Sequence, residues 1–410
     1  MNILLIDHYA GSCIHGMEYR PYYLAREWVR LGHQVTIVAA SFSHLRTVPP
    51  TIDGRVTEES IDGVRYLWYR TPAYRGNGAG RVINIFSFVG KLLRHGRRLV
   101  RDYRPELVIA SSTYPLDNLP AYRIARRASA RLVYEVHDLW PLTPMELGGM
   151  SAHHPFIMLM QWAENFACRK ADRVVSMLPN AGEHLREHGM AADKFVYVPN
   201  GVAVSEWSGD AGPLPPAHRE AIDRIRSRGR FLLAYIGGHA LSNALDTLIE
   251  AAVELERQNV AVVLVGQGVE KERLERCVRE LGLEHTIFLP PVPKKLVPAL
   301  LAEIDACYIG WTRSPLYRFG ICPNKLLDYM MSGKPVIHAI EAANDLVAEA
   351  GCGVTIPPEN SQAIVAATAQ LLAKTPSERA AMGQRGKQYV IAHHQYPHLA
   401  RQFLDSVLKS

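Results

Sequence analysis

The sequence predicts an α/β protein made of two doubly wound domains, each with a mainly parallel sheet between layers of helices. Short apolar runs of strand length alternate with amphipathic segments along most of the chain, as buried parallel strands and crossover helices require. The alternation pauses in a stretch with glycines and prolines at residues 205–230 and then starts again. The length of 410 residues also favours two or three domains over one.

The composition is that of an ordinary globular protein, with 48% hydrophobic and 21% charged residues, which argues against disorder. The formal net charge of +6 permits attraction to phosphates or anionic lipid. The six cysteines are scattered and include no C-x-x-C pair, which favours reduced thiols in the cytoplasm over disulfides or a zinc site. The first apolar run is too short for a secretory signal, and no run of about 18 apolar residues predicts a membrane span.

The first predicted elements form a strand–loop–helix–strand unit at residues 2–6, 7–16, 17–31 and 34–39. No G-x-G-x-x-G sequence follows the first strand, which disfavours a simple dehydrogenase. Residues 55–69 are predicted to form a β-hairpin, because Asp62-Gly63 supplies a two-residue turn.

Residues 80–105 are predicted to form a basic amphipathic helix. Its apolar residues recur at helical spacing, and its second half adds Lys91, Arg94, Arg97, Arg98 and Arg101. Such a helix can lie on an anionic membrane surface, and residues 81–104 are the segment expected to do so. A core helix with a solvated cationic face explains the same pattern, so both interpretations stay open.

Two further strands of the first domain are predicted at residues 107–110 and 131–136, and the second leads into His137-Asp138. Ligands of open α/β sheets bind beyond the carboxyl ends of the strands, so this pair is well placed for a role in a site. A single histidine after a strand is more often a structural hydrogen-bonding residue. The first domain is expected to cover residues 1–204, with a last helix at 394–410 packing back on it.

The second domain is expected at residues 205–393, where the same alternation gives six more strands: 231–236, 260–265, 286–289, 305–309, 335–339 and 353–356. It carries glycine loops suited to phosphate, at Gly237-Gly238, at 266–268 and at Gly320. The last of these loops leads into a helix predicted to begin at Pro323, where free N–H groups and the helix dipole favour an anion.

Charged residues surround this predicted helix start: Arg318, Lys325 and Asp328. A capped helix with a Lys325–Asp328 surface pair is the plainer interpretation. Two similar domains facing a cleft would instead bind a nucleotide-type donor on the second domain and an acceptor on the first.

These residues together resemble the family-4 retaining glycosyltransferases, which have the two-domain GT-B fold. The resemblance covers nearly the whole chain and is closest to the subgroup used in O-antigen, capsule and exopolysaccharide assembly, which includes proteins predicted to be L-fucosaminyltransferases. The segments that carry it, in order, are NILLIDHYAGSCIHGMEYRPYYLAREWVRLGHQVTIVAASFSHLR, YEVHDLWPLTPMELGGM, YVPNGV, LVGQGVEKERL and FGICPNKLLDYMMSGKPVI.

The resemblance implies a donor site on the second domain. The family's Glu-x7-Glu pair falls on Gly320 and Asp328, so Asp328 is expected to hold the ribose, while the backbone N–H of Gly320 or the side chain of Asn324 contacts the sugar. The family's Arg and Lys for the diphosphate are absent after Gly237-Gly238, where Asn243 takes about the Lys position. Compensating charge is expected from Lys271, Arg318 or Lys325.

The resemblance also implies the chemistry, with retention through an oxocarbenium-like transition state and without a metal or other cofactor. His137 is expected to contact the donor sugar or the reacting centre, and Asp138 to orient His137 or the acceptor. Gly16 is expected near the diphosphate, with Tyr19 and Arg20 facing the acceptor.

The predicted function is transfer of a sugar from a UDP-linked donor, with N-acetylated amino sugars among the candidates, in bacterial surface polysaccharide synthesis. The acceptor is a lipid-linked molecule or a glycan, no nucleic acid is involved, and the protein is expected in the cytoplasm or on the inner face of the plasma membrane. Two alternatives remain: a non-catalytic accessory subunit, and a nucleotide-sugar epimerase of the same fold.

Overall fold

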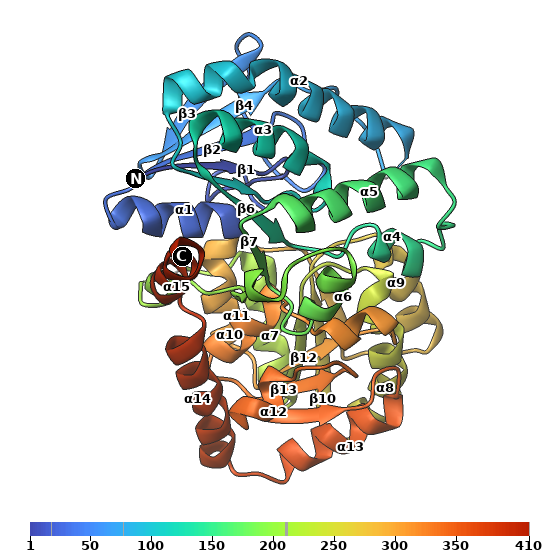
Figure 1. Cartoon of the computed structure of the whole chain (residues 1–410). Coiled ribbons are helices and arrows are strands. Elements are labelled where there is room, and N and C mark those ends of the chain that lie inside the picture. The colour runs from blue at the N-terminus through green and yellow to red at the C-terminus, as the bar shows by residue number, and fades with distance from the viewer. Residues whose placement is uncertain (18, 77, 210–211, 410) are drawn as a thin grey trace. The chain divides into compact units, whose positions relative to one another are not determined.

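The computed structural model describes residues 1–410 except 18, 77, 210–211 and 410. By its internal contacts the chain divides into an N-terminal unit, residues 1–200 and 396–410, and a C-terminal unit, residues 201–395. Each unit has its own sheet and core (Figure 1), and each is described separately. Among the described residues, no helix is both long and apolar enough to cross a bilayer.

The sheet of the N-terminal unit has eight strands in the order β3-β4-β2-β1-β5-β6-β7-β8. Its pairs are parallel except β3 with β4, which form the predicted hairpin around Asp62-Gly63, both with positive φ. The strands are β1 (Asn2–Ile6), β2 (Gln34–Ala40), β3 (Val56–Ile61), β4 (Val64–Tyr69), β5 (Leu107–Ala110), β6 (Arg131–Val136), β7 (Arg173–Ser176) and β8 (Phe195–Tyr197).

Helices cover both faces of this sheet. On one face α3 packs between α2 and α5, and on the other α1 packs against α15. The helices are α1 (Arg20–Arg30), α2 (Ala79–Tyr103), α3 (Asn118–Ala128), α4 (Leu142–Glu146), α5 (Pro155–Lys170), α6 (Gly182–Glu187) and α15 (Tyr396–Leu408), with short 3-10 helices η1 (Pro115–Asp117) and η2 (Ala192–Lys194).

The C-terminal helix α15 is part of the N-terminal unit because aromatic residues fix it to α1. The indole N–H of Trp28 donates to the carbonyl of Ala400 at 3.0 Å, and its ring packs on Phe403. Tyr23 stacks on Tyr396 with ring centroids 4.7 Å apart. These rings are fully or almost fully buried, so α15 completes a hydrophobic core rather than lying on a surface.

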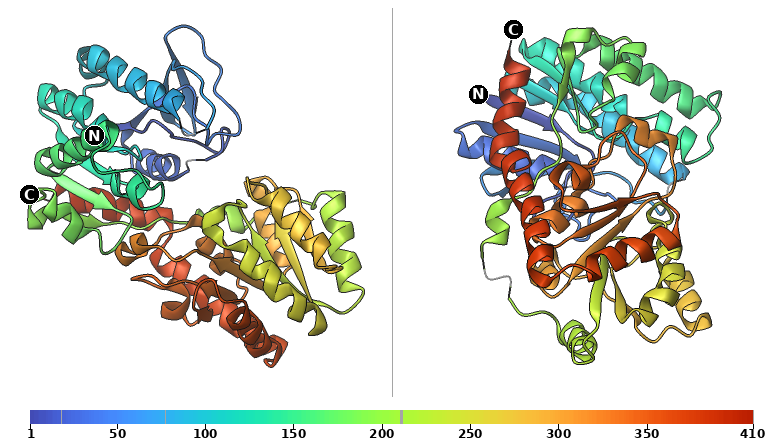
Figure 2. Two further views of the ribbon diagram at one scale, coloured as in Figure 1. Left: turned by 90° about the vertical axis from the view of Figure 1, so that its right-hand side faces the viewer. Right: turned by 90° about the horizontal axis from the view of Figure 1, so that it is seen from below.

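The C-terminal unit has a six-stranded, all-parallel sheet in the order β11-β10-β9-β12-β13-β14. Its strand β10, second from one edge, is apolar and buried along its whole length, because helices cover both faces (Figure 2). The strands are β9 (Phe231–Ile236), β10 (Val260–Val265), β11 (Thr286–Leu289), β12 (Ala306–Gly310), β13 (Val336–Ala339) and β14 (Gly353–Ile356).

The helices of this unit alternate with its strands, as a doubly wound domain requires. They are α7 (Pro216–Arg226), α8 (Leu245–Arg257), α9 (Lys271–Glu280), α10 (Val297–Ala302), α11 (Asn324–Met331), α12 (Leu346–Ala350), α13 (Ser361–Leu372) and α14 (Pro376–His393), with 3-10 helices η3 (Val204–Trp207), η4 (Leu241–Asn243), η5 (Lys294–Leu296) and η6 (Pro315–Phe319). The predicted fold class, two doubly wound α/β domains, is confirmed.

Two helices begin later than predicted. Helix α1 starts at Arg20 rather than at residue 17, since Gly16 pairs with Ser12 in a β-bridge and has a φ of +86°; position 18 lies outside the described residues. Helix α11 starts at Asn324, and Pro323 is its N-cap residue with extended backbone angles, rather than the first helical residue.

Candidate active site

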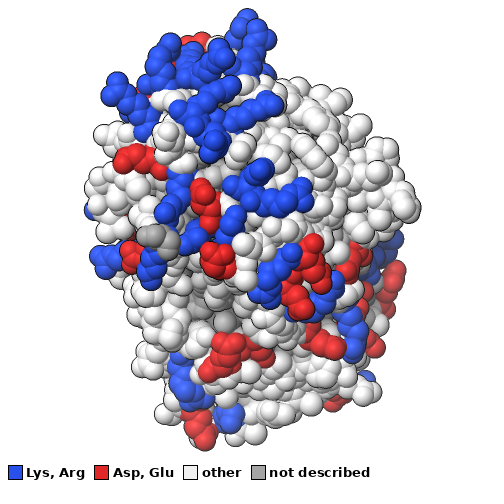
Figure 3. All heavy atoms as spheres, in the orientation of Figure 1, with Lys and Arg blue, Asp and Glu red and all other residues white. Residues whose placement is uncertain are grey.

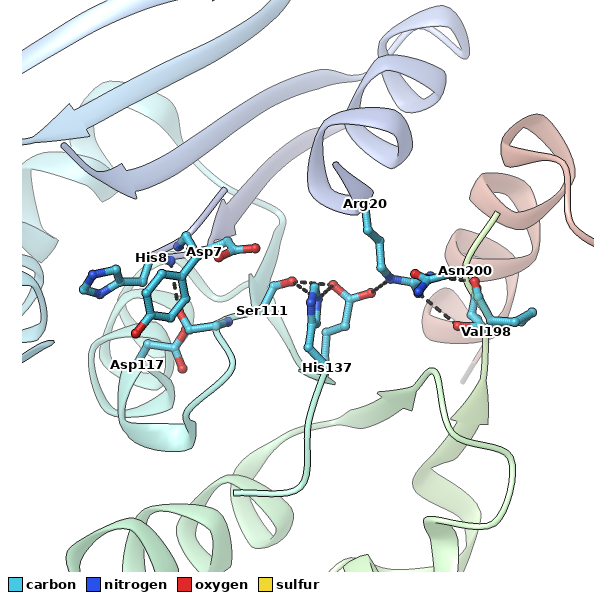
Figure 4. Close-up of polar contacts among 12 residues, drawn as sticks. Asp7, His8, Arg20, Ser111, Asp117, His137, Val198 and Asn200 are labelled. Atoms are coloured by element: carbon cyan, nitrogen blue, oxygen red, sulfur yellow. Dashed lines mark hydrogen bonds and ion pairs between the residues drawn. The ribbon is translucent and has the colours of Figure 1, made fainter. Parts of the chain in front are cut away.

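The carboxyl ends of β1, β5 and β6 lie side by side in the N-terminal unit and bring polar side chains together (Figure 4). His137 follows β6, and its Nε2 lies 2.8 Å from the hydroxyl of Ser111, which follows β5. The same nitrogen is 3.3 Å from Oε2 of Glu135. His137 is therefore held on the strand-end face predicted for it, by two partners that the sequence analysis did not single out.

Glu135 is a fully buried carboxylate on β6. Burial alone would raise its pKa, but Arg20 and the hydrogen bonds from His137 and Ser111 outweigh it and lower the pKa to about 2. The side chain is thus ionised at neutral pH and orients the imidazole ring. Glu135 is two residues before His137, and residues at this spacing share one face of a strand. That spacing is the signal that sequence reasoning overlooked.

Arg20 is buried rather than exposed toward an acceptor. Its side chain is 1% exposed, and its Nε lies 2.9 Å from Oε1 of Glu135. Its terminal nitrogens donate to the carbonyl oxygens of Val198, at 3.0 Å, and Pro199. We call Arg20, Ser111, Glu135 and His137 the strand-end network. Within it Arg20 acts as the counter-ion of Glu135.

Asp138 accepts hydrogen bonds from within its own turn. Its Oδ1 accepts a hydrogen bond from the hydroxyl of Thr143 at 2.6 Å, and its Oδ2 accepts one from the indole N–H of Trp140 at 3.0 Å. Burial raises its pKa. Asp138 therefore fixes the turn that leads into α4, and Glu135 is the carboxylate paired with His137.

The remaining predicted residues of the N-terminal unit lie around the loop after β1. Tyr19 is half-buried at the N-cap of α1, with its ring 6.0 Å from that of Tyr23. Gly16 has a positive φ, and a Cβ there would lie 2.5 Å from the hydroxyl oxygen of Thr47. Glycine is thus required at position 16 by local packing and backbone conformation.

The glycine loops after β9 and β10 lie against each other in the C-terminal unit. The N–H of Gly237 donates to the carbonyl of Val265 at 2.9 Å, and that of His239 to the carbonyl of Gln267 at 2.9 Å. A Cβ on Gly266 would lie 1.9 Å from the carbonyl oxygen of Gly237. Only glycine permits this approach, which brings Gly237 and Gly238 to the start of the loop at 266–268.

Lys325, on α11, reaches these loops. Its Nζ lies 2.7 Å from both the hydroxyl of Tyr235 and Oδ1 of Asn243, and 3.3 Å from where a Cβ on Gly237 would be. No Asp or Glu among the described residues pairs with it, and burial lowers its pKa to about 7. We call Tyr235, Gly237, Asn243 and Lys325 the Lys325 cluster.

Two further residues lie beside this cluster. Lys271 begins α9, and its Nζ lies 3.4 Å from the carbonyl oxygen of Gly266. His239 is fully buried, and burial together with the charges of Lys271 and Lys325 lowers its pKa to about 4. Two lysines therefore lie beside the glycine loops, although the family's Arg and Lys are absent, and Lys271 is also 3.9 Å from Oε1 of Glu275.

Asp328 pairs with a different lysine from the one considered in the sequence. Its two carboxylate oxygens lie 3.1 and 2.9 Å from Nζ of Lys294, which begins η5. The interpretation as a Lys325–Asp328 surface pair is therefore wrong. Lys294 is 34 residues away in the chain, so no local pattern could have indicated it.

Gly320 ends η6 in a conformation that other residues rarely adopt, with a φ of +97°. Its N–H donates to the carbonyl of Tyr317 at 3.0 Å and is therefore already in use within the turn. Arg318 is exposed, and its guanidinium lies 4.4 Å from the ring centre of Phe319. Asn324 is exposed at the first position of α11.

A cavity of about 540 Å³ lies beside Arg318, beyond the carboxyl ends of β12 and β13. Arg313 and Glu341 face each other across part of it, with Nη1 3.1 Å from Oε2. The cavity therefore combines charges of both signs with small residues. It is lined by Arg313, Ser314, Pro315, Arg318, Glu341, Ala342 and Ala343.

The comparisons with known proteins match both units. Residues 15–201 match the Glycosyl transferase 4-like domain, and residues 220–389 match the Glycosyl transferases group 1 domain. The two matches follow one another and cover most of the chain. The chain belongs to the family-4 glycosyltransferases. It is an enzyme of glycosyl transfer, and its two doubly wound units make up the GT-B fold.

Two relatives of this glycosyltransferase have described roles. WcaI of Escherichia coli (strain K12), provisionally described as a colanic acid biosynthesis glycosyl transferase, is 24% identical over 365 residues, 84% of this chain and 86% of WcaI. The alpha-D-kanosaminyltransferase of Streptomyces kanamyceticus is 23% identical over 298 residues, 68% of this chain and 71% of that protein.

Solved structures share the fold. Sucrose-phosphate synthase from Thermosynechococcus elongatus superposes with a TM-score of 0.74 at 17% identity, over 99% of this chain and 98% of that one. Anabaena HepE, crystallised with UDP and glucose, gives a TM-score of 0.68 at 18% identity, over all of both chains. WaaG, a glycosyltransferase of lipopolysaccharide biosynthesis, gives 0.66 at 15% identity, again over all of both chains.

Proposed function

We propose that this glycosyltransferase transfers a sugar from a UDP-linked donor, with retention, to a lipid-linked or glycan acceptor in bacterial surface polysaccharide synthesis. The observation that carries the proposal is the Lys325 cluster, in which a half-buried lysine lies beside paired glycine loops and has no carboxylate partner among the described residues. The presence of UDP in HepE and the role described for WcaI support the donor and the pathway. N-acetylated amino sugars are among the candidate donors.

The donor diphosphate binds, in this proposal, between Lys325, Lys271 and the backbone of Gly237 and Gly238. A buried ammonium group is costly without an anion, so a diphosphate beside Nζ of Lys325 stabilises its charged form. Asp328 holds the ribose while remaining bonded to Lys294. Asn324, rather than the backbone N–H of Gly320, contacts the sugar, because that N–H is already bonded to Tyr317.

The main catalytic task is to stabilise the departing diphosphate, as positive groups and backbone donors do. Lysines and glycine loops supply both here, so transfer itself needs no metal or other cofactor. His137 acts at the reacting centre, with its ring oriented by Glu135 and Ser111. Gly16 belongs to the loop expected near the diphosphate, and Tyr19 to the acceptor side.

The test is donor binding followed by turnover. Thermal unfolding is recorded with a panel of nucleotide sugars, because a ligand that binds only the folded state raises the midpoint. We expect UDP-linked donors to raise it, and Lys325→Ala to abolish the rise. Lys295→Ala is the control, since Lys295 is an exposed lysine near the same site. An unchanged rise in Lys325→Ala would refute the assigned donor site.

Turnover separates the alternatives. Donor hydrolysis or transfer to extracted lipid acceptors supports a transferase, whereas isomerisation of the donor alone identifies an epimerase. Binding of UDP without turnover across donors and acceptors identifies an accessory subunit.

We also propose that the N-terminal unit contacts an anionic membrane on the inner face of the plasma membrane, through α2 together with α5. The solvent-facing stripe of α2 includes Ile83 and Phe86, 59% and 45% exposed. On α5, Met158 and Trp162 are 57% and 49% exposed. The opposite face of α2 is buried in the core of the unit, for example at Phe88, as the core-helix interpretation expects. The exposed apolar stripe lies outside that core and supports a membrane contact of residues 81–104 in addition.

Basic residues adjoin these apolar ones on the same helices. The exposed stripe of α2 continues with Arg94, Arg97 and Arg101, and α5 ends with Arg169-Lys170. Figure 1 shows α2, α3 and α5 side by side with their N-terminal ends at the right, and Figure 3 shows Lys and Arg gathered at the upper left, with few charges at the upper right. Apolar insertion next to cationic contacts is typical of surface-bound proteins.

Co-sedimentation with vesicles tests this contact. We expect binding to vesicles that contain phosphatidylglycerol, weaker binding in high salt, and loss in a Phe86→Ser/Trp162→Ser variant. The control is Leu241→Ser/Val269→Ser, which removes exposed apolar side chains of the C-terminal unit. Equal sedimentation of the two variants would contradict the proposal.

A further inference from the structure

Three metal-ligating side chains converge in the N-terminal unit, outside the strand-end network. Glu164 lies on α5, His184 lies on α6, and His188 is the C-cap residue of α6. Their ligand atoms all lie within 4.8 Å of one another, and they are the only such group among the described residues. No local sequence pattern indicates this group, because 20 residues separate Glu164 from His184.

We propose that Glu164, His184 and His188 bind one divalent transition-metal ion, with Zn²⁺ the best fit. Imidazole nitrogens with a carboxylate oxygen suit Zn²⁺, Co²⁺ or Ni²⁺. Three protein ligands leave a fourth position for water. The ion fastens α5 to α6, so its role is to stabilise the N-terminal unit rather than to take part in sugar transfer.

The three side chains lie close enough together to share one such ion. Nε2 of His184 lies 3.2 Å from Oε1 of Glu164, and Nε2 of His188 lies 3.4 Å from Oε2, so each imidazole faces a different oxygen of the carboxylate. A tetrahedral ion with bonds of about 2.0–2.1 Å holds its ligand atoms about 3.3–3.4 Å apart. The contact of His184 also lies within hydrogen-bond distance, so small shifts of the side chains separate the hydrogen-bonded arrangement from the ion-bound one.

The burial of Glu164 points to a bound cation as well. Its side chain is 0% exposed, and no lysine or arginine among the described residues pairs with it. Its other contact is the amide nitrogen of Gln161, 2.8 Å from Oε2. A buried carboxylate is strongly unfavourable without compensating charge, and a divalent ion between the carboxylate and the imidazoles supplies it.

Local structure explains why the two histidines face the same point. Residues four apart share one face of a helix, and the rings of His184 and His188 lie with centroids 4.3 Å apart. Gln161 orients the carboxylate from the outside, the usual arrangement around a metal ligand. The side chain of His188 is 22% exposed, which gives an ion a path from solvent.

The test is a cobalt titration of the full-length protein after treatment with EDTA. We expect one equivalent of Co²⁺ to give the intense visible absorption of a tetrahedral site, and Zn²⁺ to displace it. Zn²⁺ should also raise the thermal unfolding midpoint of the EDTA-treated protein. Absence of the tetrahedral spectrum in the natural protein would overturn the proposal.

Variants locate the ion. His188→Gln, at a partly exposed position, should fold normally and lose the tetrahedral spectrum, and Gln161→Leu should weaken binding by about 10- to 100-fold. His153→Gln/His398→Gln removes two exposed histidines and should change nothing. Tetrahedral binding that survives in His188→Gln, or that is lost with His153 and His398, would also overturn the proposal, leaving two imidazole N–H groups that share a carboxylate.

Discussion

The strand-end network and the Lys325 cluster both hold a buried charge, but they compensate it differently. In the strand-end network the carboxylate of Glu135 is paired with Arg20 at 2.9 Å and bonded to Ser111. In the Lys325 cluster the ammonium group contacts neutral oxygens of Tyr235 and Asn243, and no carboxylate in the described part of the chain pairs with it. The charge of Glu135 in the strand-end network is therefore compensated without a ligand. In the Lys325 cluster the positive charge of Lys325 is compensated only when an anion binds beside it. That property is expected of a site for the donor diphosphate.

The largest expected effect is on stability and comes from breaking the ion pair between Arg20 and Glu135 in the strand-end network. Arg20→Met leaves Glu135 buried without a counter-ion, so we expect the free energy of unfolding to fall by about 3–5 kcal/mol, measured by urea denaturation at pH 7. Arg98→Met is the control, because its pair with Asp102 is on the surface, and it should change stability little. A similar small loss in Arg20→Met would show that the pair is not structural.

The difference in unfolding free energy between the natural protein and Arg20→Met should depend on pH. The pKa of Glu135 is lowered in the folded state to about 2 from an ordinary value of 4.5. The stabilisation is therefore fully present above pH 4.5 and is lost as the pH falls toward 2. The gap in stability between the natural protein and Arg20→Met should accordingly narrow over that interval.

The next largest effect is on donor binding by Lys325, in the Lys325 cluster. Lys325→Met removes a charged hydrogen-bond donor, worth about 1.5–3 kcal/mol, so we expect roughly 10- to 150-fold weaker binding of UDP-glucose by calorimetry. Because burial places the pKa of Lys325 at about 7, the natural protein should lose about tenfold in affinity between pH 7 and 8.5 as the lysine deprotonates. Lys325→Met should show no such slope, and an equal slope in both proteins would assign the titration elsewhere.

A smaller effect is expected at Gly320. Gly320→Glu places the family's carboxylate at a position with a φ of +97°, so we expect a loss of about 1–3 kcal/mol in unfolding free energy and no gain in donor turnover. Gly76→Glu is the control, since Gly76 also has a positive φ, of 65°, and a Cβ there would meet nothing within 4 Å. A gain in turnover for Gly320→Glu would mean that the loop can reshape to use the added group.

The smallest effect is expected for Asp328. Asp328→Asn keeps the shape of the side chain but weakens its bonds to Lys294 and to the donor ribose, so we expect about 1 kcal/mol weaker binding of UDP. The same substitution should change binding of inorganic diphosphate much less. A larger loss for diphosphate than for UDP would place Asp328 at the phosphates rather than at the ribose.

The sequence by itself determined the fold class and the family. Runs such as 231–236 and 260–265 are apolar throughout, and a fully buried parallel strand needs that pattern, so the two doubly wound domains were predictable. The order of the short motifs along the chain likewise indicated the family. Periodicity and motif order are local properties of the chain, and both could be read directly.

Only the tertiary structure decided which charges meet. Arg20 reaches Glu135 across 115 residues, Lys294 reaches Asp328 across 34, and Lys325 reaches Asn243 across 82. The sequence placed Arg20 at an acceptor, did not single out Glu135 as a partner of His137, and missed the convergence of Glu164 with two histidines. The strand order and the helix packing bring these distant groups together. Once they are buried, charged groups pair with the opposite charges or hydrogen-bonding groups that the fold places beside them, because an uncompensated buried charge is unfavourable.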